Sequence, residues 1–360
     1  MSSDSEKYSI QIQNNLACDE NVNGKKLQLF LLRNKYNFQV AITNYGARVV
    51  SILVANNQGG FTDIALGYDN IKTYLKSNEP FFGATIGRYS NRLAKGKFIL
   101  EGKEYQIDIN NGPNSLHGGK EGFSNQVWDA TQINKQSIEL SYLSKDNEGG
   151  YPGNLNVKIS YTLTDDNALK IKYTATTDKN TVINLTNHTY FNLNGEGNGS
   201  INDHLLTINA NSITEINEKL IPTGKLIPVI GTPFDFTKPT EIGSRLNSLH
   251  EQLIKGNGYD HNFVLNEGNT LRFAAKVVGP KTGIILEVFT EEPGMQFYGG
   301  NYLNGSDKDG KCGKSYDYRT GFCLETQHFP DSPNHSHFPT TILKPGQVFK
   351  STTIYKFSVE

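Results

Sequence analysis

Short runs of alternating apolar and polar residues, separated by turn residues, extend along most of the chain. Such alternation is typical of half-buried strands, and Gly, Asn and Asp are typical of the turns between them. The pattern predicts strands in five segments: 26–46 and 97–108, with turns at Arg33-Asn34-Lys35 and Glu101-Gly102-Lys103, 136–144, 155–176, with a turn at Asp165-Asp166-Asn167, and 282–292. Helical periodicity is confined to 72–77 and 241–253. The pattern therefore favours an all-β sandwich or barrel.

Nothing in the sequence divides this β structure into separate domains. We find no linker, low-complexity segment or internal repeat in the 360 residues. The Gly- and Asn-rich stretch 192–203 is predicted to be a surface loop. We therefore expect one continuous domain over residues 1–360, although the length would permit two.

Charge balance and cysteine content narrow the classes of function. The chain has 35 Lys and Arg against 36 Asp and Glu, a formal net charge of −1, so it lacks the basic excess typical of nucleic-acid binding. Three cysteines, Cys18, Cys312 and Cys323, are too few for a disulfide framework. The N-terminal sequence MSSDSEKYSI has no signal-peptide pattern, and no window has the apolar length of a membrane span. We expect a cytoplasmic monomer or weak homodimer without a nucleic-acid or membrane partner.

One stretch, TVINLTNHTYFNL (181–193), is unusually rich in amides and hydroxyls around a single histidine. Interpreted as a strand, it places successive side chains on opposite faces. One face, with Asn187 as its odd member, is otherwise suited to a core. The other carries Asn184, Thr186, His188, Tyr190 and Asn192. This second face is too polar for a core, and it predicts a surface that binds a polar ligand. A lone histidine in a strand is more often structural than functional. The functional interpretation of His188 therefore depends on the polar residues that share its face.

Further candidate residues lie in four separate motifs. His117 is in the glycine-rich GPNSLHGG, and Asn91 and Arg92 precede a predicted hairpin in GRYSNRLAKGKF. Asp260 is in NGYDHNFVL, where it has the alternative of an ordinary turn residue. Glu325 alternates with apolar residues in GFCLETQ, and a carboxylate in an apolar strand is costly unless it is paired or functional.

Three histidines near the C-terminus offer an alternative metal site. His328, His335 and His337 lie in QHFPDSPNHSHFP. Their spacing matches no zinc signature, and loop histidines beside prolines are commonly solvated. We therefore predict no metal.

Seven motifs, taken in order, resemble the aldose 1-epimerase (galactose mutarotase) family. They are NRLAKGKF, NSLHGG, NLTNHTYFNL, GTPFDF, GYDHNFVL, EPGMQFYGGN and GFCLETQHFPDSPN, and the similarity extends from NYGARVVSILV (44–54) to the C-terminal LKPGQVFKSTTIYKF. It covers nearly the whole chain, with residues 1–25 as an N-terminal extension and the HSH segment at 335–337 outside the motifs. The resemblance implies a large antiparallel β-sandwich with an open sugar cleft on one sheet, and no cofactor.

The family also implies roles for individual residues. His188 is similar to the family's general acid and Glu325 to its general base, whereas the residues that resemble its sugar-binding set are Asn91, Arg92, His117, Asp260 and Gln296, to which we add Tyr190 from the polar face. Ring opening of a hemiacetal requires a proton to leave the C1 hydroxyl and another to reach the ring oxygen. A carboxylate, with a reference pKa of ~4.3, can accept the first, and a histidine, at ~6.5, can donate the second if nearby acids keep it protonated. We expect Asp260 near His188 and Arg92 near Glu325 to favour these charged forms.

Three alternatives use the same residues differently. A noncatalytic sugar-binding module would keep the polar face but would not need both His188 and Glu325. A glycoside hydrolase would use Asp260 and Glu325 as its two carboxylates. An epimerase of hexose 6-phosphates would need an additional cationic group for phosphate, which no motif supplies.

Overall fold

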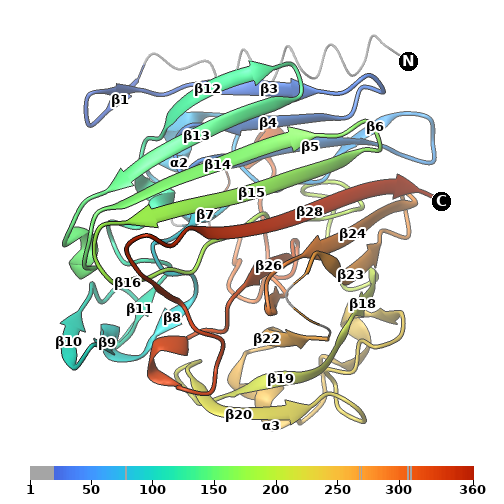
Figure 1. Ribbon diagram of the computed structural model, residues 1–360. Coiled ribbons are helices and arrows are strands. Elements are labelled where there is room, and N and C mark those ends of the chain that lie inside the picture. Colours follow the sequence, from blue (N-terminus) through green and yellow to red (C-terminus); the bar gives the residue numbers. More distant parts are fainter. Residues whose placement is uncertain (1–19, 78, 267, 269, 306–307, 309) are drawn as a thin grey trace.

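The computed structural model describes residues 20–360 except positions 78, 267, 269, 306–307 and 309. Its largest antiparallel sheet in the described chain has nine strands (Figure 1). In spatial order these are β12 (Asp129–Asn134), β13 (Ser137–Ser144), β14 (Leu155–Leu163), β15 (Ala168–Thr177), β28 (Phe349–Val359), β24 (Ile284–Thr290), β23 (Arg272–Val278), β18 (Leu205–Ile208) and β21 (Thr240–Glu241). The C-terminal β28 pairs with both β15 and β24 and so joins two parts of the chain that are distant in sequence.

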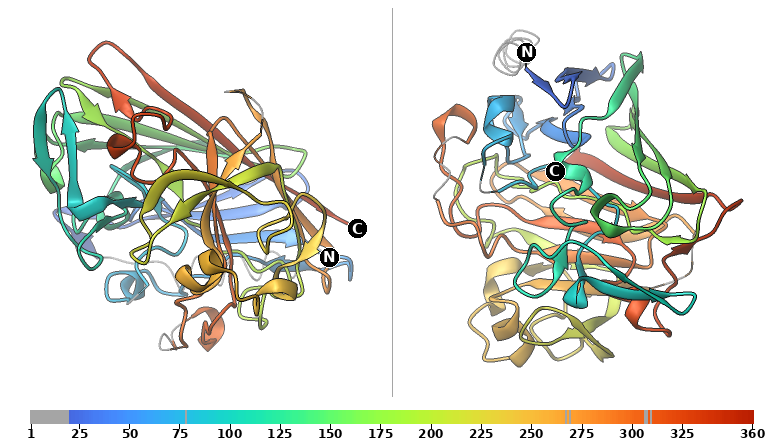
Figure 2. Two further views of the ribbon diagram at one scale, coloured as in Figure 1. Left: turned by 90° about the horizontal axis from the view of Figure 1, so that it is seen from below. Right: turned by 90° about the vertical axis from the view of Figure 1, so that its left-hand side faces the viewer.

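Two smaller antiparallel sheets complete the main architecture of the described chain. One contains β3 (Leu29–Arg33), β4 (Gln39–Thr43), β5 (Arg48–Ala55) and β6 (Phe61–Asp63). The other contains, in spatial order, β20 (Pro222–Pro228), β19 (Ala210–Ile216), β22 (Asp260–Leu265), β25 (Gly294–Tyr298) and β26 (Cys323–Gln327). Figure 1 and the right-hand view of Figure 2 show the yellow and orange strands of this second sheet below the blue and green strands of the others. The all-β antiparallel sandwich predicted from the alternation is confirmed.

The alternation in the sequence corresponds to burial in the strands. In β14, every second residue from Leu155 to Leu163 is buried and those between them are exposed or half-buried. A single core cluster includes Val40 from β4, Ile159 from β14 and Phe263 from β22. All three sheets therefore contribute apolar side chains to one core, whose burial is the main favourable contribution to folding.

Shorter elements connect these sheets. The two-residue and hairpin strands are β1 (Asn21–Val22), β2 (Lys25–Lys26), β7 (Thr85–Ile86), β8 (Arg92–Leu93), β9 (Lys97–Leu100), β10 (Lys103–Gln106), β11 (Ser115–Leu116), β16 (Thr181–Val182), β17 (Thr186–Asn187) and β27 (Ile342–Leu343). The helical elements are α2 (Ile71–Tyr74), α3 (Glu251–Lys255), η1 (Ala94–Gly96), η2 (Phe123–Asn125), η3 (Glu148–Gly150), η4 (Ile242–Arg245), η5 (Lys311–Gly313) and η6 (Ser332–Asn334). The predicted hairpins and both short helical regions are confirmed. None of the helices in the described chain has the length and apolar character needed to cross a bilayer.

The segment 181–193 differs from the continuous strand that was predicted. It forms only β16, β17 and isolated bridges at Asn184 and Phe191, and every residue in it is buried. Its polar side chains also serve different purposes. Asn184 accepts a hydrogen bond from the His328 backbone N–H at 3.0 Å, and Asn192 donates to the carbonyl of Thr320 at 3.0 Å. The prediction of one polar face turned to a ligand is wrong for these two amides, because they bind neighbouring backbone instead.

The predicted surface loop at 192–203 is only partly exposed. Residues 198–200 are exposed, but Glu196 is buried. Its carboxylate accepts hydrogen bonds from the Tyr316 hydroxyl at 2.8 Å and from Lys314 Nζ at 3.2 Å. These polar partners satisfy a carboxylate that composition alone would place in solvent.

Candidate active site

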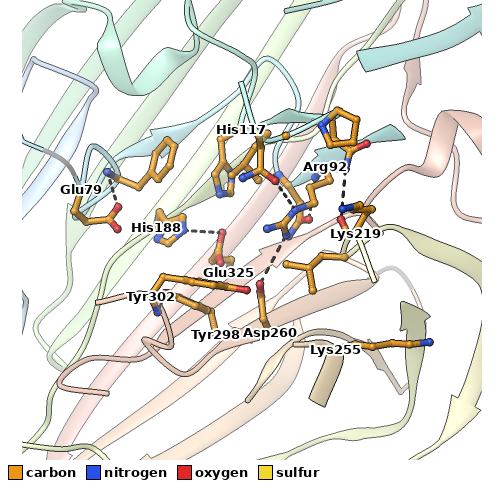
Figure 3. Close-up of a pocket in the computed structure, with 18 of the residues that line it drawn as sticks. Glu79, Arg92, His117, His188, Lys219, Lys255, Asp260, Tyr298, Tyr302 and Glu325 are labelled. Atoms are coloured by element: carbon orange, nitrogen blue, oxygen red, sulfur yellow. Dashed lines mark hydrogen bonds and ion pairs between the residues drawn. The ribbon is translucent and has the colours of Figure 1, made fainter. Parts of the chain in front are cut away.

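A cavity of about 430 Å³ lies beside three neighbouring strands of the five-stranded sheet, β22, β25 and β26, each of which contributes a lining residue (Figure 3). The rest of its lining comes from β8, β11, α3 and loops. Predicted site residues in the lining are Asn91, Arg92, His117, His188, Tyr190, Asp260 and Glu325. These residues span more than two hundred positions in the sequence, so the fold gathers the predicted set into one place.

His188 and Glu325 lie side by side in this cavity, as Figure 3 shows. Glu325 is the central residue of β26, and His188 directly follows β17. The distance from His188 Nε2 to Glu325 Oε2 is 3.6 Å, and both side chains are at most 5% exposed. Among the described residues, Glu325 Oε2 has no hydrogen-bond partner. A buried carboxylate oxygen of this kind is well suited to a hydroxyl donor from a ligand.

Burial favours the neutral form of each member of this pair. Burial, with a smaller contribution from the positive charge of Arg48, lowers the pKa of His188 to about 3. Burial also raises the pKa of Glu325 well above its usual value, and the negative charge of Asp260 adds to this rise while Arg92 opposes it. The expectation that Asp260 and Arg92 would impose the charged forms is therefore wrong. Removal of water outweighs the neighbouring charges here.

His117 faces the same cavity, and its ring orientation is set by the backbone. Its Nδ1 accepts a hydrogen bond from the Asn91 N–H at 3.2 Å. A neutral ring whose Nδ1 is an acceptor carries its proton on Nε2. Burial lowers the pKa of His117 well below the usual value, with smaller contributions from His188 and Arg92. His117 therefore offers the cavity one N–H donor.

One group of side chains in the described chain could hold a metal ion, and it consists of His117, His188 and Glu325. One potential ligand atom from each lies within 4.8 Å of the others. A metal on Nε2 of His117 would have to displace the proton to Nδ1, directly against the Asn91 N–H. This tautomer conflict disfavours the metal. The absence of a metal remains a prediction.

Arg92 and Asp260 form a second charged pair across the cavity. Arg92 Nη1 lies 3.7 Å from Asp260 Oδ2, and Arg92 Nε donates to Asn111 Oδ1 at 3.2 Å. Gln296 donates to the other Asp260 oxygen at 2.7 Å. Gln296 does not belong to the cavity lining. Its Nε2 is directed to Asp260, whereas its Oε1 has no hydrogen-bond partner among the described residues. The sugar contact of Gln296 stays a prediction.

Aromatic rings enclose the two histidines. The ring of Phe81 is stacked on that of His188 with centroids 5.7 Å apart, and lies 4.6 Å from that of His117. Tyr190 is stacked on the other neighbouring side of His188 at 5.0 Å, and Tyr298 lies 6.4 Å from it. The imidazole of His188 is therefore fixed by packing as well as by the contact of its Nδ1 with Cys323 Sγ at 3.4 Å.

Several lining residues were missed by the sequence analysis. They are Glu79, Phe81, Asn111, Gly112, Pro113, Asn114, Leu116, Glu218, Lys219, Leu220, Lys255, Tyr298 and Tyr302. Gly112, Pro113, Asn114 and Leu116 lie in the quoted motif GPNSLHGG and Tyr298 lies in EPGMQFYGGN, but none of them was named as a site residue. The others lie outside the motifs and are brought to the cavity by tertiary contacts. Two of them, Lys219 and Lys255, are cations that the sequence analysis did not find. Lys255 Nζ is already paired with Glu251, at 2.5 Å, and with Glu218, at 3.4 Å.

The three C-terminal histidines contact different groups of the protein. His328 Nδ1 lies 2.6 Å from a Glu292 oxygen, and His335 Nε2 lies 3.4 Å from Asp331 Oδ2. His337 Nε2 contacts the Gly224 carbonyl at 2.7 Å. The rings of His335 and His337 lie 6.0 Å apart, but each of the three histidines has a different protein partner, and none belongs to the group of described residues that could hold a metal ion.

Comparison with known proteins agrees with this geometry. The family model of aldose 1-epimerase matches residues 28–356. Galactose mutarotase of Bos taurus is 46% identical over 321 residues, covering 89% of this chain and 91% of that protein. Aldose 1-epimerase of Escherichia coli is 36% identical over 340 residues, covering 94% and 97%. The crystal structure of galactose 1-epimerase from Lactobacillus acidophilus superimposes with a TM-score of 0.83 at 31% identity, covering 94% and 97%. The chain belongs to the aldose 1-epimerase family.

Proposed function

We propose that this protein interconverts the α and β anomers of free hexoses such as D-galactose and D-glucose. His188 and Glu325 are the catalytic pair in this proposal. The observation that carries it is the 3.6 Å approach of their reactive atoms inside a cavity of hexose-compatible size. In the ring-opening step, Glu325 takes the proton of the C1 hydroxyl, His188 gives a proton to the ring oxygen, and the C1–O5 bond breaks. Rotation about C1–C2 then exposes the other aldehyde face, and the two groups exchange roles as the ring closes.

The environment of the pair favours ring opening. Before opening, the proton is on His188 and Glu325 is ionised. After opening, the proton is on Glu325 and His188 is neutral. Burial favours this second, neutral arrangement, because it raises the pKa of Glu325 and lowers the pKa of His188. A base of raised pKa accepts more readily and an acid of lowered pKa donates more readily, so both proton transfers are favourable from the charged pair. The same burial makes the charged pair the less populated form, so the proposed reaction depends on forming that pair first.

The remaining cavity residues bind the sugar in this proposal. Arg92 and Asn91 donate to hydroxyls, Asp260 accepts from them, and the Nε2–H of His117 donates. Tyr190 covers one side of His188, and Gln296 acts indirectly through Asp260. General acid and base catalysis contribute roughly 10²–10⁴-fold each. That is sufficient for a reaction that already proceeds spontaneously in water, so the proposal needs neither metal nor cofactor.

The state of Lys255, one of the two cavity lysines, favours the free-sugar proposal over an epimerase of hexose 6-phosphates. Lys255 is paired with two carboxylates, and Figure 3 shows its amine directed away from Arg92 and Asp260. A phosphate group would have to compete with these carboxylates. Arg92 is likewise engaged with Asp260.

Polarimetry of freshly dissolved α-D-glucose or α-D-galactose tests the proposal. We expect the wild-type protein to accelerate the approach to anomeric equilibrium without releasing reducing ends from disaccharides. Glu325→Gln and His188→Asn should each lower kcat by about 10²–10⁴-fold, and Thr326→Val, in the same strand, serves as the control. Wild-type rates in either variant would refute the catalytic pair. No acceleration by the wild type would favour a sugar-binding module, and reducing-end release would favour a hydrolase.

The proposal extends to the context in which the protein works. We propose a single domain over residues 1–360, with residues 1–25 as a peripheral extension, and the family match from residue 28 to 356 supports it. Residues 1–19 lie outside the described residues. We further propose a cytoplasmic monomer or weak homodimer whose partner is a small-molecule aldose, in keeping with the net charge of −1. Sedimentation equilibrium of the full chain tests the oligomeric state.

A further inference from the structure

Arg48 is a fully buried cation held by backbone carbonyls. It is the first residue of β5 and is 0% exposed. The acceptors of its guanidinium are the carbonyl oxygens of Phe82 (2.7 Å), Pro80 (3.0 Å), Ser124 (3.1 Å) and Tyr45 (3.4 Å). No ion pair between Arg48 and a carboxylate is found in the described chain. An unpaired buried charge costs several kcal/mol of desolvation, so a position that retains one calls for an explanation beyond packing.

Two of these four acceptors flank a single cavity residue. Pro80 and Phe82 are the neighbours of Phe81, and Phe81 together with Glu79 lines the cavity. Arg48 therefore holds the 79–83 segment on both sides of Phe81. The ring of Phe81 in turn contacts the rings of both His188 and His117.

The 79–83 segment also contacts His188 through its backbone. The Gly83 N–H donates to the His188 carbonyl at 3.0 Å, and the Gly83 carbonyl accepts from the Val49 N–H at 2.9 Å. Gly83 has a φ of +66°, and a Cβ there would lie 1.7 Å from the Val49 carbonyl oxygen. The segment therefore lies between the start of β5, where Arg48 is located, and His188.

We propose that Arg48 is a positioning residue of the reaction: by fixing the 79–83 segment it makes Phe81 hold the His188 ring at its distance from Glu325. This inference rests on the proposed function. Arg48 is fully buried and is not one of the residues that line the cavity. Its charge has a second effect in the same direction, because it adds to the burial that lowers the pKa of His188 and so strengthens the imidazolium as an acid.

The test compares two buried arginines that both donate to backbone carbonyls. The carbonyls bound by Arg48 flank a cavity residue, and those bound by Arg272 do not. Arg272 also donates to four backbone carbonyls, those of Asn266, Thr270, Thr290 and Glu292, but none of these residues lines the cavity. We expect Arg48→Met to lower kcat by about 10- to 100-fold, as displacement of a catalytic group by an ångström does, with KM changed less than about threefold. Arg272→Met should lower the melting temperature but leave kcat and KM of the folded enzyme within about twofold. An unchanged kcat in Arg48→Met, or an equal loss in both variants, would overturn the inference.

A double-mutant cycle keeps the inference testable if Arg48→Met does not fold. If Arg48 acts through Phe81, Arg48→Lys should lower kcat in the wild-type background but have little further effect in Phe81→Leu. Independent, multiplicative losses would refute the coupling. The proposed function is judged separately, since its tests are the activity of the wild type and the loss of activity in Glu325→Gln and in His188→Asn.

Discussion

Glu325 is a residue whose catalytic usefulness conflicts with the stability of the fold. Burial raises the pKa of its carboxyl well above the usual value. As the pH rises above ~4.3, the unfolded chain releases this proton while the native protein keeps it. The unfolded state thereby gains free energy of ionisation that the native state does not. The contribution of Glu325 to stability is therefore fully present below pH ~4.3 and is lost as the pH rises through the native pKa.

We accordingly predict that Glu325→Gln is more stable than the wild type at alkaline pH, although it is inactive. Glutamine has a similar shape and cannot ionise, so the stabilisation relative to wild type should grow from pH 5 to pH 8. Urea unfolding at the two pH values measures it. Glu104→Gln, on the exposed hairpin of β9 and β10, is the control for the substitution itself. A stability difference that stays constant with pH would contradict the prediction.

His117 is predicted to act mainly in binding. Its Nε2–H is a single neutral donor, and such a hydrogen bond contributes about 0.5–1.5 kcal/mol. His117→Ala should therefore raise KM by about threefold to tenfold and change kcat less. His117 has a φ of +54°, a conformation that Asn tolerates better than Ala. His117→Asn is thus the matched variant that separates loss of the donor from backbone strain. A loss confined to kcat in both would contradict a binding role.

The sequence analysis identified the site residues that lie in recognisable motifs. It missed cavity residues whose positions depend on tertiary contacts. Asp260, His188 and Glu325 were predicted to be site residues through motif resemblance, and they do meet in the cavity. Phe81 and Glu79 have no such signal, because their positions depend on the carbonyl contacts of Arg48, 31 and more residues earlier in the chain. The pKa directions were also missed, since burial cannot be read from sequence spacing.

Among the elements, the segment 181–193 shows how local pattern and tertiary structure diverge. Alternation predicted one strand with a polar face. Instead, among the described residues, the segment pairs briefly with β27 and β7 and forms three isolated bridges, one at Asn184 and two at Phe191. Both of its faces are covered. Its amides substitute for the regular ladder by binding backbone groups of other loops. His188 reaches the cavity because this irregular backbone is held on both sides.

Asn192 tests this structural role. It is 0% exposed, donates to the carbonyls of Gly199 and Thr320, and accepts from the Asn194 N–H. We predict that Asn192→Ala costs about 3 kcal/mol of unfolding free energy, because it leaves these buried groups unpaired. The kcat and KM of the folded enzyme should stay within about twofold. Chemical unfolding and polarimetry measure the two effects. A raised KM without loss of stability would instead support the original interpretation of Asn192 as part of a ligand-binding face.

For the molecule as a whole, the strand pattern predicted the fold class and the local hairpins but not the pairing of strands that are distant in sequence. Alternation in β14 and the turn residues after β9 are local features, and they appear as expected. The placement of β28 between β15 and β24 joins residues nearly two hundred positions apart. That pairing is set by which apolar faces cover one another, a property of the assembled core that no window of sequence contains.

Buried neutral histidines make the whole fold sensitive to acid, and His261 allows this to be measured away from the catalytic pair. His261 is 0% exposed, and burial lowers its pKa to about 3. Between pH ~6.5 and the native pKa, the unfolded chain binds a proton at this residue and the native protein does not, so stability falls as pH falls. Relative to His261→Gln, the wild type should lose roughly 2 kcal/mol of unfolding free energy between pH 7 and pH 5. His337→Gln, at an exposed histidine, controls for the loss of a histidine. A wild-type stability that follows that of His261→Gln in parallel at both pH values would show that this ring is protonated in the native core.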